Sequence, residues 1–376
     1  FSGKVGRFPR DFHLDVDPEA VPFYQLRPYP LNSQHLEVLK GELDRQEALG
    51  IIKKCHVATH WCLPMFCHAK KDGIIHTVHD FWPLNRAIRR KIYMMPRIQD
   101  ILFGTREYWF LMKTDISMQY YAFWLDEEST WYCVFITLFG KYRLMRLAMG
   151  CIQSADYVQA AMEEVFHDLR EEVVVYMDDL KSQHIEWSDH IKMIDEMLRH
   201  LLEYGFMVNP LKCEWGIQET DFLGYHLTPK GPKPWSKRIE PILCMEEPKT
   251  LTELCGFIGM VNFYQSMFKK RAEVLAPLTS MTKISPLQFK KEWGPKQKEA
   301  FQSAKAMVAS QTLLWWPDLN KQFVIETNAS DYQLGAVIKQ EDQPIAFYSC
   351  KLTGPQQKYS TIEKELLAIL EVLEEY

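Results

Sequence analysis

The hydrophobic and polar positions of the N-terminal part of the chain predict an extended arm, a helix and a hairpin. Residues 1–31 are rich in proline and show no regular apolar period, which is typical of an extended arm. Apolar residues then recur at roughly helical spacing and predict a helix over about 34–49, which ends at Gly50. Residues 61–81 alternate in polarity around a Lys-Asp-Gly turn at 71–73, the pattern of a β-hairpin.

Strand-like and helix-like segments alternate along the rest of the chain. The predicted elements are short strands within 106–150, a helix at 154–167, a Val-rich strand through 171–183, a helix at 190–205, a strand at 221–228, a helix at 250–268, and three strands and a helix over 322–376. The Val-rich strand is predicted to run straight into two adjacent aspartates. The pattern indicates an α+β fold with an antiparallel sheet that carries acidic residues, followed by a smaller mixed domain.

Length and charge narrow this picture only slightly. A chain of 376 residues suggests two or three domains, and it contains no apolar run near the ~20 residues that a membrane-spanning helix needs. The net charge of −5 does not by itself indicate a nucleic-acid partner, so a local basic groove would have to bind a phosphate backbone. Basic residues gather at 86–91, 269–271 and 290–298, and solvated charged faces explain such runs equally well.

The nine cysteines favour a reducing compartment over a disulfide framework, because the number is odd and no CxxC pair occurs. One group needs separate treatment, since six Cys and His residues fall within 55–68. Zinc could use four of them, although their spacing matches no standard finger or knuckle. Whether this cluster binds zinc stays open on sequence alone.

Paired carboxylates carry the main chemical signal. Asp178 and Asp179 end the predicted Val-rich strand, and Asp115 ends another apolar segment. Adjacent carboxylates at the end of an apolar strand are costly unless a cation compensates them. Carboxylates from two strand ends are what a two-metal phosphoryl-transfer site requires, because Mg²⁺ prefers oxygen ligands. An isolated pair of aspartates is otherwise most often a turn or a helix cap.

The sequence around these aspartates resembles a known family. Tyr-Met-Asp-Asp at 176–179 looks like the polymerase signature of retroviral and retrotransposon reverse transcriptases. Further similar segments follow in family order, closest to gypsy-type LTR retrotransposons (Metaviridae-like Pol polyproteins): GIIKK at 50–54, KKDG at 70–73, DFWPLN at 80–85, MPRIQDIL at 95–102, FLGYHLTPKG at 222–231, LAPLT at 275–279 and KLTGPQQKYSTIEKELLAIL at 351–370. The resemblance covers the chain from about residue 20.

The resemblance implies a fold and a domain order. The expected fold is a right-hand polymerase with fingers, palm and thumb, followed by a truncated RNase H-like α/β domain. The expected segments are an N-terminal arm at 1–31, fingers and the start of the palm at 32–114, palm at 115–235 with a fingers insertion at about 121–148, thumb and connection at 236–290, and a partial RNase H-like domain at 291–376.

The resemblance also assigns roles to residues. Asp115, Asp178 and Asp179 would be catalytic and bind two Mg²⁺ ions, with Mn²⁺ as a possible substitute. Tyr120 matches the aromatic gate that excludes a 2′-hydroxyl, although the ring alone would as readily be a core residue. The remaining expected sites are a dNTP site at Lys70, His76, Tyr120, Met149 and Gly150, a primer grip at Leu223, Gly224 and Tyr225, template contacts at Asn85 and Gln159, and an RNase H remnant at Asn328 and Glu365.

The chain departs from the family pattern at several of these positions. His76 stands where the family has an arginine that contacts the triphosphate, and Trp82 stands where an arginine is usual. Asn328 replaces the first RNase H carboxylate, and the later ones fall beyond residue 376. The RNase H portion is therefore expected to be inactive.

These observations favour an RNA-directed DNA polymerase that acts on dNTP and a primer–template of RNA or DNA. The alternative is a catalytically retired, retroelement-derived subunit that binds nucleic acid or serves a structural role, which the changes at His76 and Asn328 motivate. A metal-dependent nuclease fits less well, because the RNase H ligands are the altered ones. No membrane partner is expected, a homodimer or other Pol-derived subunits are possible partners, and the expected location is intracellular, in cytoplasmic virus-like particles or the nucleus.

Overall fold

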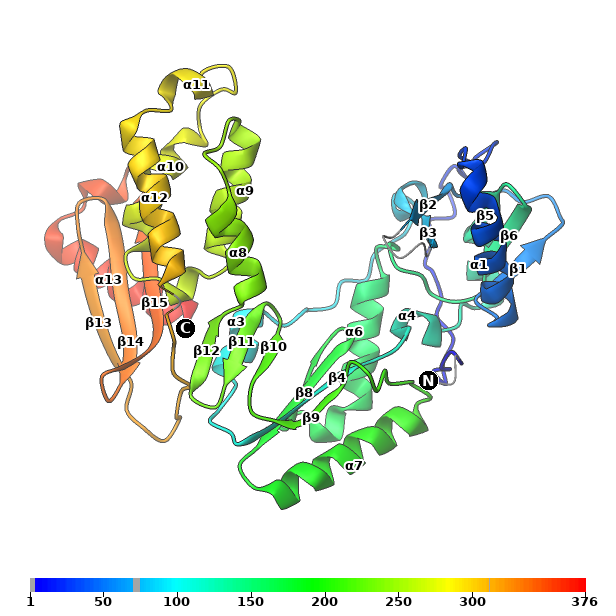
Figure 1. The fold of residues 1–376 in the computed structure, drawn as a ribbon, viewed down its shortest axis with the longest axis horizontal. Coiled ribbons are helices and arrows are strands. Elements are labelled where there is room, and N and C mark those ends of the chain that lie inside the picture. The colour runs from blue at the N-terminus through cyan, green and yellow to red at the C-terminus, as the bar shows by residue number, and fades with distance from the viewer. Residues whose placement is uncertain (1–3, 70–74, 311) are drawn as a thin grey trace. The chain divides into compact units, whose positions relative to one another are not determined.

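The computed structural model describes residues 4–69, 75–310 and 312–376, and the chain divides into two compact units. The first unit comprises Phe1–Pro96 and Phe110–Gly216, and the second comprises Arg97–Trp109 and Ile217–Tyr376. Helices and strands occur in both units, as the α+β pattern predicts (Figure 1). No helix among the described residues is long and apolar enough to cross a bilayer.

The N-terminal part of the first unit contains two small antiparallel sheets. Helix α1 (Leu36–Ala48) follows a short 3-10 turn, so the helix predicted over 34–49 is confirmed. One sheet has the order β1-β6-β5 and consists of Ile52–Cys55, Gly140–Leu144 and Val134–Thr137. The other is the predicted hairpin of β2 (Met65–Ala69) and β3 (Ile75–His79), with His68 opposite His76. Short helices α2 (Trp82–Asn85), α4 (Gln119–Ala122) and α5 (Glu127–Tyr132) join these elements.

A four-stranded antiparallel sheet forms the centre of the first unit. Its order is β7-β8-β4-β9, with the strands Val173–Tyr176, Asp179–His184, Phe110–Asp115 and Glu214–Ile217. Helices α6 (Ser154–Val165) and α7 (Trp187–Glu203) pack against it. The expectation of one strand running through both aspartates was wrong, because the chain reverses at Met177-Asp178 and forms the β7–β8 hairpin. Met177 has a φ of 55°, which lets this turn close after only four strand residues.

A buried arginine ties the N-terminal arm to the first unit. The guanidinium of Arg146 donates hydrogen bonds to the carbonyl oxygens of Gly6 and Tyr121 at 2.7 Å and of Gly50 at 3.1 Å. It also stacks on Trp124 at 4.2 Å. Burial lowers the pKa of Arg146 to about 10, and the charge of Arg7 acts in the same direction. Carbonyl dipoles from three separate segments thus satisfy this cation.

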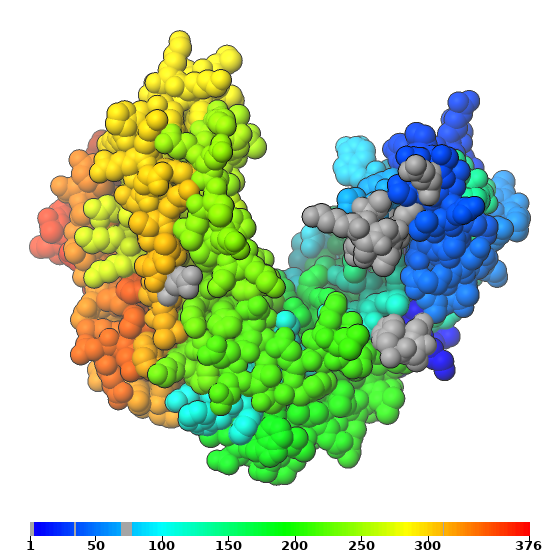
Figure 2. Space-filling view, viewed as in Figure 1, coloured from blue at the N-terminus to red at the C-terminus, as the bar shows by residue number. Residues whose placement is uncertain are grey.

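The second unit begins with a three-stranded sheet and a group of helices. Strands β10 (Thr220–Phe222), β11 (Tyr225–Thr228) and β12 (Gly231–Pro234) form an antiparallel meander, so the strand predicted at 221–228 is in fact a hairpin. The helices are α3 (Ile98–Phe103), α8 (Ser236–Cys244), α9 (Leu251–Asn262), α10 (Arg271–Met281), α11 (Phe289–Glu292) and α12 (Pro295–Ala309). The helix predicted over 250–268 ends at Asn262 and continues as a 3-10 turn. Helices α8 to α12 form one continuous surface (yellow-green to orange-yellow in Figure 2).

The C-terminal part contains a second antiparallel sheet and one helix. Strands β13 (Val324–Ala329), β14 (Gln333–Gln340) and β15 (Gln343–Lys351) pair in sequence order. Helix α13 (Thr361–Glu375) buries Ala368 and Val372 against this sheet. Ser360 and Glu363 form a reciprocal capping box at its start, which satisfies two backbone N–H groups.

Candidate active site

The central sheet places two of the three predicted catalytic aspartates side by side. Asp115 is the last residue of β4, Asp179 is the first residue of β8, and the two are opposite one another in the antiparallel register. Side chains of opposed residues lie on the same face of a sheet. Asp178 is exposed in the turn before Asp179, and its carbonyl oxygen accepts a hydrogen bond from the N–H of Ile116 at 3.1 Å. The hairpin thus brings all three residues to one edge of the sheet.

The electrostatics of this edge reflect crowded negative charge. Burial raises the pKa of Asp179, and the neighbouring charges of Asp178 and Asp115 raise it further. Lys113 and Lys212 act in the opposite direction. The ammonium of Lys212 lies 3.2 Å from the carboxylate of Asp115, and sequence analysis did not identify this contact. Carboxylates held together in this way ionise at an electrostatic cost that a bound cation relieves.

The carboxylates of Asp115, Asp178 and Asp179 are suitable ligands for a hard divalent cation. In this structure they are not yet arranged around one common point. Three carboxylates supply the oxygen ligands that Mg²⁺ prefers, and Mg²⁺ needs only one or two protein carboxylates when substrate phosphates and waters complete its shell. Within the described ranges, no three His, Cys, Asp or Glu side chains are arranged to hold a metal ion together. Lys212 supplies a positive charge to Asp115 instead. Substrate phosphates and a shift of Lys212 would therefore be needed to complete the coordination.

The Cys and His residues at 55–68 were the other candidate metal site. In the described part of the chain, no three of them are close enough together to hold a metal ion. Burial raises the pKa of the Cys62 thiol to about 11 and also raises that of Cys67. Zinc binds the thiolate, so these environments disfavour it as a ligand.

Tyr120 lies close to the aspartates. It belongs to α4, which follows Met118 in the left-handed region with a φ of 49°. The ring is partly buried against the core of the first unit. Burial raises the pKa of Tyr120, and the negative charge of Asp178 adds to this effect. The phenol and the carboxylate are therefore near enough to interact electrostatically.

A loop that contains Met149 and Gly150 is held by Asn85. The amide of Asn85 donates to the carbonyl oxygen of Gly150 at 2.9 Å and accepts from the N–H of Ile152 at 2.8 Å. Gly150 has a φ of 96°, a conformation that L side chains rarely adopt, and Met149 is 70% exposed. Asn85 was expected to contact the template, and its amide is already used to hold this loop.

Two of the expected dNTP contacts, Lys70 and His76, lie in or next to residues 70–74, which the structure does not describe. Lys70 is outside the described residues. His76 belongs to β3, where its backbone pairs opposite His68, and its side chain is outside the described part of the structure. Their roles stay predictions.

Gln159, the other predicted template contact, has a structural role in this fold. Its side chain is completely buried and bonds to the protein backbone, so its role at a template stays a prediction. The amide oxygen accepts from the N–H of Met177 at 2.8 Å, and the amide nitrogen donates to the carbonyl oxygen of Val175 at 3.0 Å. A second buried glutamine, Gln119, donates to the carbonyl oxygen of Met177 at 2.9 Å. No pattern in the sequence distinguished Gln119 from an ordinary helical residue.

The expected primer grip forms the turn of the β10–β11 hairpin. Leu223 and Gly224 have φ values of 48° and 86°, as a two-residue hairpin turn of this hand requires. A Cβ atom on Gly224 would lie 2.9 Å from the ring of Phe263. Tyr225 is 2% exposed, and its hydroxyl donates to the carbonyl oxygen of Phe263 at 3.1 Å. Within the hairpin, Tyr225 therefore supports the turn through its buried ring, and the assignment of these three residues to a primer grip stays a prediction.

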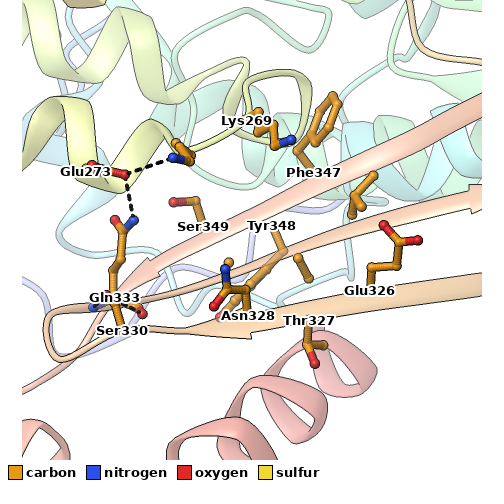
Figure 3. A pocket seen from close by; sticks show the side chains of 14 residues that line it. Lys269, Glu273, Glu326, Thr327, Asn328, Ser330, Gln333, Phe347, Tyr348 and Ser349 are labelled. Atoms are coloured by element: carbon orange, nitrogen blue, oxygen red, sulfur yellow. Dashed lines mark hydrogen bonds and ion pairs between the residues drawn. The ribbon is translucent and has the colours of Figure 1, made fainter.

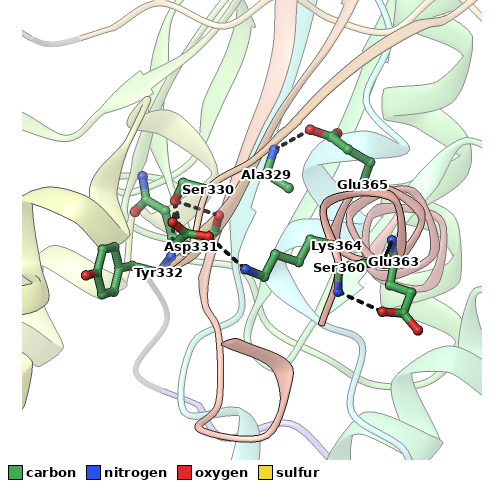
Figure 4. Close-up of polar contacts among 9 residues, drawn as sticks. Ala329, Ser330, Asp331, Tyr332, Ser360, Glu363, Lys364 and Glu365 are labelled. Carbon is green, nitrogen blue, oxygen red and sulfur yellow. Dashed lines mark hydrogen bonds and ion pairs between the residues drawn. The ribbon is translucent and has the colours of Figure 1, made fainter. Parts of the chain in front are cut away.

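The two RNase H remnant residues do not share a site in the second unit. Asn328 is exposed and lines a pocket of about 450 Å³ together with Lys269, Glu273 and Tyr348 (Figure 3). Glu365 does not line this pocket. Its carboxylate accepts a hydrogen bond from the N–H of Ala329 at 3.1 Å, on the side of β13 that packs against α13 (Figure 4). Residues 328 and 329 are neighbours in one strand, so their side chains point to opposite faces.

Comparison with known proteins gives the same assignment over two parts of the chain. The family described as "Reverse transcriptase (RNA-dependent DNA polymerase)" matches residues 68–227, and that described as "RNase H-like domain found in reverse transcriptase" matches residues 293–376. The Tf2-3 and Tf2-4 transposon polyproteins of Schizosaccharomyces pombe are 28% identical over 357 residues. These matches cover 93% of this chain and 26% of each polyprotein, so the chain spans about a quarter of the relatives' length.

Solved structures extend the similarity to the fold. The foamy viral protease-reverse transcriptase dRH in complex with double-stranded DNA matches all of this chain with a TM-score of 0.90 at 21% identity, and 66% of that chain is covered. The foamy viral protease-reverse transcriptase in complex with double-stranded DNA matches 99% with a TM-score of 0.87, covering 78% of that chain at 21% identity. The predicted fold class is confirmed. Residues 68–227 are thus similar to a reverse transcriptase domain and residues 293–376 to an RNase H-like domain, and the chain as a whole is similar to one part of retrotransposon polyproteins.

Proposed function

We propose that this chain is an RNA-directed DNA polymerase that extends a primer 3′-hydroxyl with dNTP on an RNA or DNA template. The observation that carries the proposal is the opposed register of Asp115 and Asp179, with Asp178 in the adjoining turn. Burial and mutual repulsion make this group a poor structural element and a good cation site. The reverse transcriptase domain over residues 68–227 includes all three residues.

Asp115, Asp178 and Asp179 are proposed to hold two Mg²⁺ ions. When bound, such ions lower the pKa of an attacking hydroxyl and neutralise charge on the triphosphate and its leaving group. Asp178 is exposed and free to turn toward a ligand, whereas Asp115 must exchange its contact with Lys212 for a cation. Lys212 would then be free to interact with the phosphates of the substrate.

Substrate selection is assigned to the residues around this edge. Tyr120, half-buried beside Asp178, supplies a rigid ring against which a 2′-hydroxyl would clash. Met149 and Gly150 form an exposed loop that Asn85 holds in place, which suits close approach of a nucleotide to the backbone. Lys70 and His76 are proposed to meet the triphosphate, and a lysine ammonium suits that task.

The second unit is proposed to hold nucleic acid without cleaving it. The hairpin turn at Leu223 and Gly224 is tight and packs closely against Phe263, which suits a primer grip. RNase H activity is not expected, because Asn328 carries no charge and Glu365 is engaged with the backbone of β13. The complexes of foamy viral reverse transcriptase with double-stranded DNA and with an RNA/DNA hybrid support a duplex as the partner.

The decisive experiment is Mg²⁺-dependent extension of a DNA primer on an RNA template. The wild-type chain should extend the primer, and Asp178→Asn should abolish extension while leaving binding of the primer–template intact. Glu365→Gln is the matched control, since it also removes one carboxylate charge. A wild-type chain that binds the primer–template without extending it would favour the alternative, a retired subunit that only binds nucleic acid.

A further inference from the structure

The turn between β7 and β8 is held by two glutamine side chains that come from different helices. Met177 occupies the left-handed region with a φ of 55°, which is uncommon for a residue other than glycine and requires support from its surroundings. Its N–H donates to Gln159 of α6, and its carbonyl oxygen accepts from Gln119 of α4. Both polar groups of this residue are therefore bound by side chains rather than by a strand partner.

Gln159 and Gln119 differ in what else they hold. The amide nitrogen of Gln159 also bonds to Val175 and to the carboxylate of Glu163, so this residue belongs to a larger network within α6 and β7. Among the described residues, the side chain of Gln119 makes one hydrogen bond, from its amide nitrogen to the carbonyl oxygen of Met177. Its amide oxygen is buried and has no partner among the described residues. A buried side chain with this one specific contact is poorly explained as packing alone.

The hydrogen bond between Gln119 and Met177 connects two segments that carry predicted site residues. Gln119 immediately precedes Tyr120, and both belong to the four-residue helix α4. Met177 immediately precedes Asp178. The hydrogen bond between Gln119 and Met177 therefore joins the short segment that carries the ring to the short turn that carries the carboxylate. A helix this short has little cooperative stability of its own, so its placement depends on such contacts.

We propose that Gln119 is a positioning residue that couples the Tyr120 helix to the Asp178 turn, so that sugar selection and placement of the catalytic carboxylate depend on one another. This inference rests on the proposed function for the roles of Tyr120 and Asp178, but the mechanical link can be tested without it. A displacement of α4 by an incoming sugar would be transmitted to the turn through the Gln119 amide. An isolated gate would leave the turn unaffected.

The first test measures the link in the protein alone. Gln119→Met keeps the length of the side chain and removes the hydrogen bond. Amide hydrogen exchange of the peptide that spans residues 173–180 should become about fivefold faster in this variant, which corresponds to the loss of one ordinary hydrogen bond. Gln340→Met is the matched control, because Gln340 is also buried and donates to backbone carbonyls, of Asp318 and Lys321. Exchange of 173–180 that is unchanged in Gln119→Met, or equally raised in Gln340→Met, would overturn the inference whether or not the chain is a polymerase.

The second test measures the coupling in the reaction. With primer–template bound, Gln119→Met should lower kcat for dNTP about tenfold and reduce the preference for dNTP over rNTP, while the Kd for the duplex stays unchanged. Gln340→Met should leave this preference unaltered. A reduced kcat with wild-type sugar preference would show that the two elements act separately and would refute the coupling. Absence of Asp178-dependent extension in the wild type would instead refute the proposed function, and the exchange experiment would still decide on the link.

Discussion

Two regions of the molecule carry residues that the family resemblance predicts to be metal ligands, and the contacts of these residues differ between the two regions. In the first unit, Asp115 and Asp179 are opposed on neighbouring strands and repel one another, with Asp178 alongside. In the second unit, Asn328 faces a polar pocket, while Glu365 accepts a backbone hydrogen bond on the other side of the strand. In the first region the carboxylates repel one another, and a bound cation would reduce this repulsion. In the second region Glu365 is not crowded by Asn328, which carries no charge, so a cation would gain less there. Mutual crowding of carboxylates, rather than the mere presence of acidic residues, therefore distinguishes a candidate metal site from a carboxylate whose charge is already hydrogen-bonded.

The largest expected effect comes from removing one crowded carboxylate. Asp178→Asn should reduce primer extension by about 10³-fold or more, because one metal ligand is lost where several kcal/mol of transition-state stabilisation depend on it. Glu365→Gln should change extension less than twofold. Steady-state extension with both variants measures the contrast, and equal losses in the two would remove the distinction between the regions.

A second effect concerns the ring beside the crowded carboxylates. Tyr120→Val should lower the preference for dCTP over CTP by roughly a hundredfold, because a large steric barrier to the 2′-hydroxyl is removed. The ratio of kcat/KM for the two nucleotides measures it. Tyr132→Val, in α5, is the control and should keep the wild-type ratio. If both variants behave alike, Tyr120 is simply a core ring.

A third effect concerns stability and its dependence on pH. Asp179→Asn should raise the free energy of unfolding by about 1 kcal/mol at pH 7, because the folded state pays to ionise this carboxyl. The pKa of Asp179 is raised on folding, so the gain is fully present above the folded-state value. It disappears as the pH falls below the ordinary value of 3.8, where the carboxyl is protonated in both states. Urea unfolding in Mg²⁺-free buffer at pH 3.5, 5 and 7 checks the sign. A variant less stable than the wild type at pH 7 would contradict the assignment of strain to this site.

The smallest effect is expected in the second region. Asn328→Asp should change the free energy of unfolding by no more than about 0.5 kcal/mol, since the side chain is exposed. It should not produce Mg²⁺-dependent cleavage of RNA in an RNA/DNA hybrid, because Glu365 does not face the same pocket. Cleavage above the level of the wild-type chain would show that the two side chains can converge after all.

Sequence reasoning anticipated the family, the fold class and the α1 helix, because long apolar periods and an ordered series of motifs carry that information. It missed the hairpin between Tyr176 and Asp179, since a run of valines followed by aspartates gives no sign of where the chain turns. Local patterns also could not show that Gln159 and Tyr225 are buried. Their burial depends on α6 and on the contacts of Phe263, which are tertiary features. The contacts of Gln119 and Lys212 were missed for the same reason.

Arg146 has a consequence for the folding of the first unit. Its carbonyl partners at Gly6, Gly50 and Tyr121 lie 140, 96 and 25 residues away in sequence. Closing loops over such separations is entropically costly, and the contacts of Arg146 offset part of that cost. Once docked, the arm supplies an acceptor to a buried cation whose other bonds cannot replace it. Loss of the segment around Gly6 would therefore leave the buried guanidinium with its bonds to Gly50 and Tyr121 only, so this segment contributes to the stability of the core.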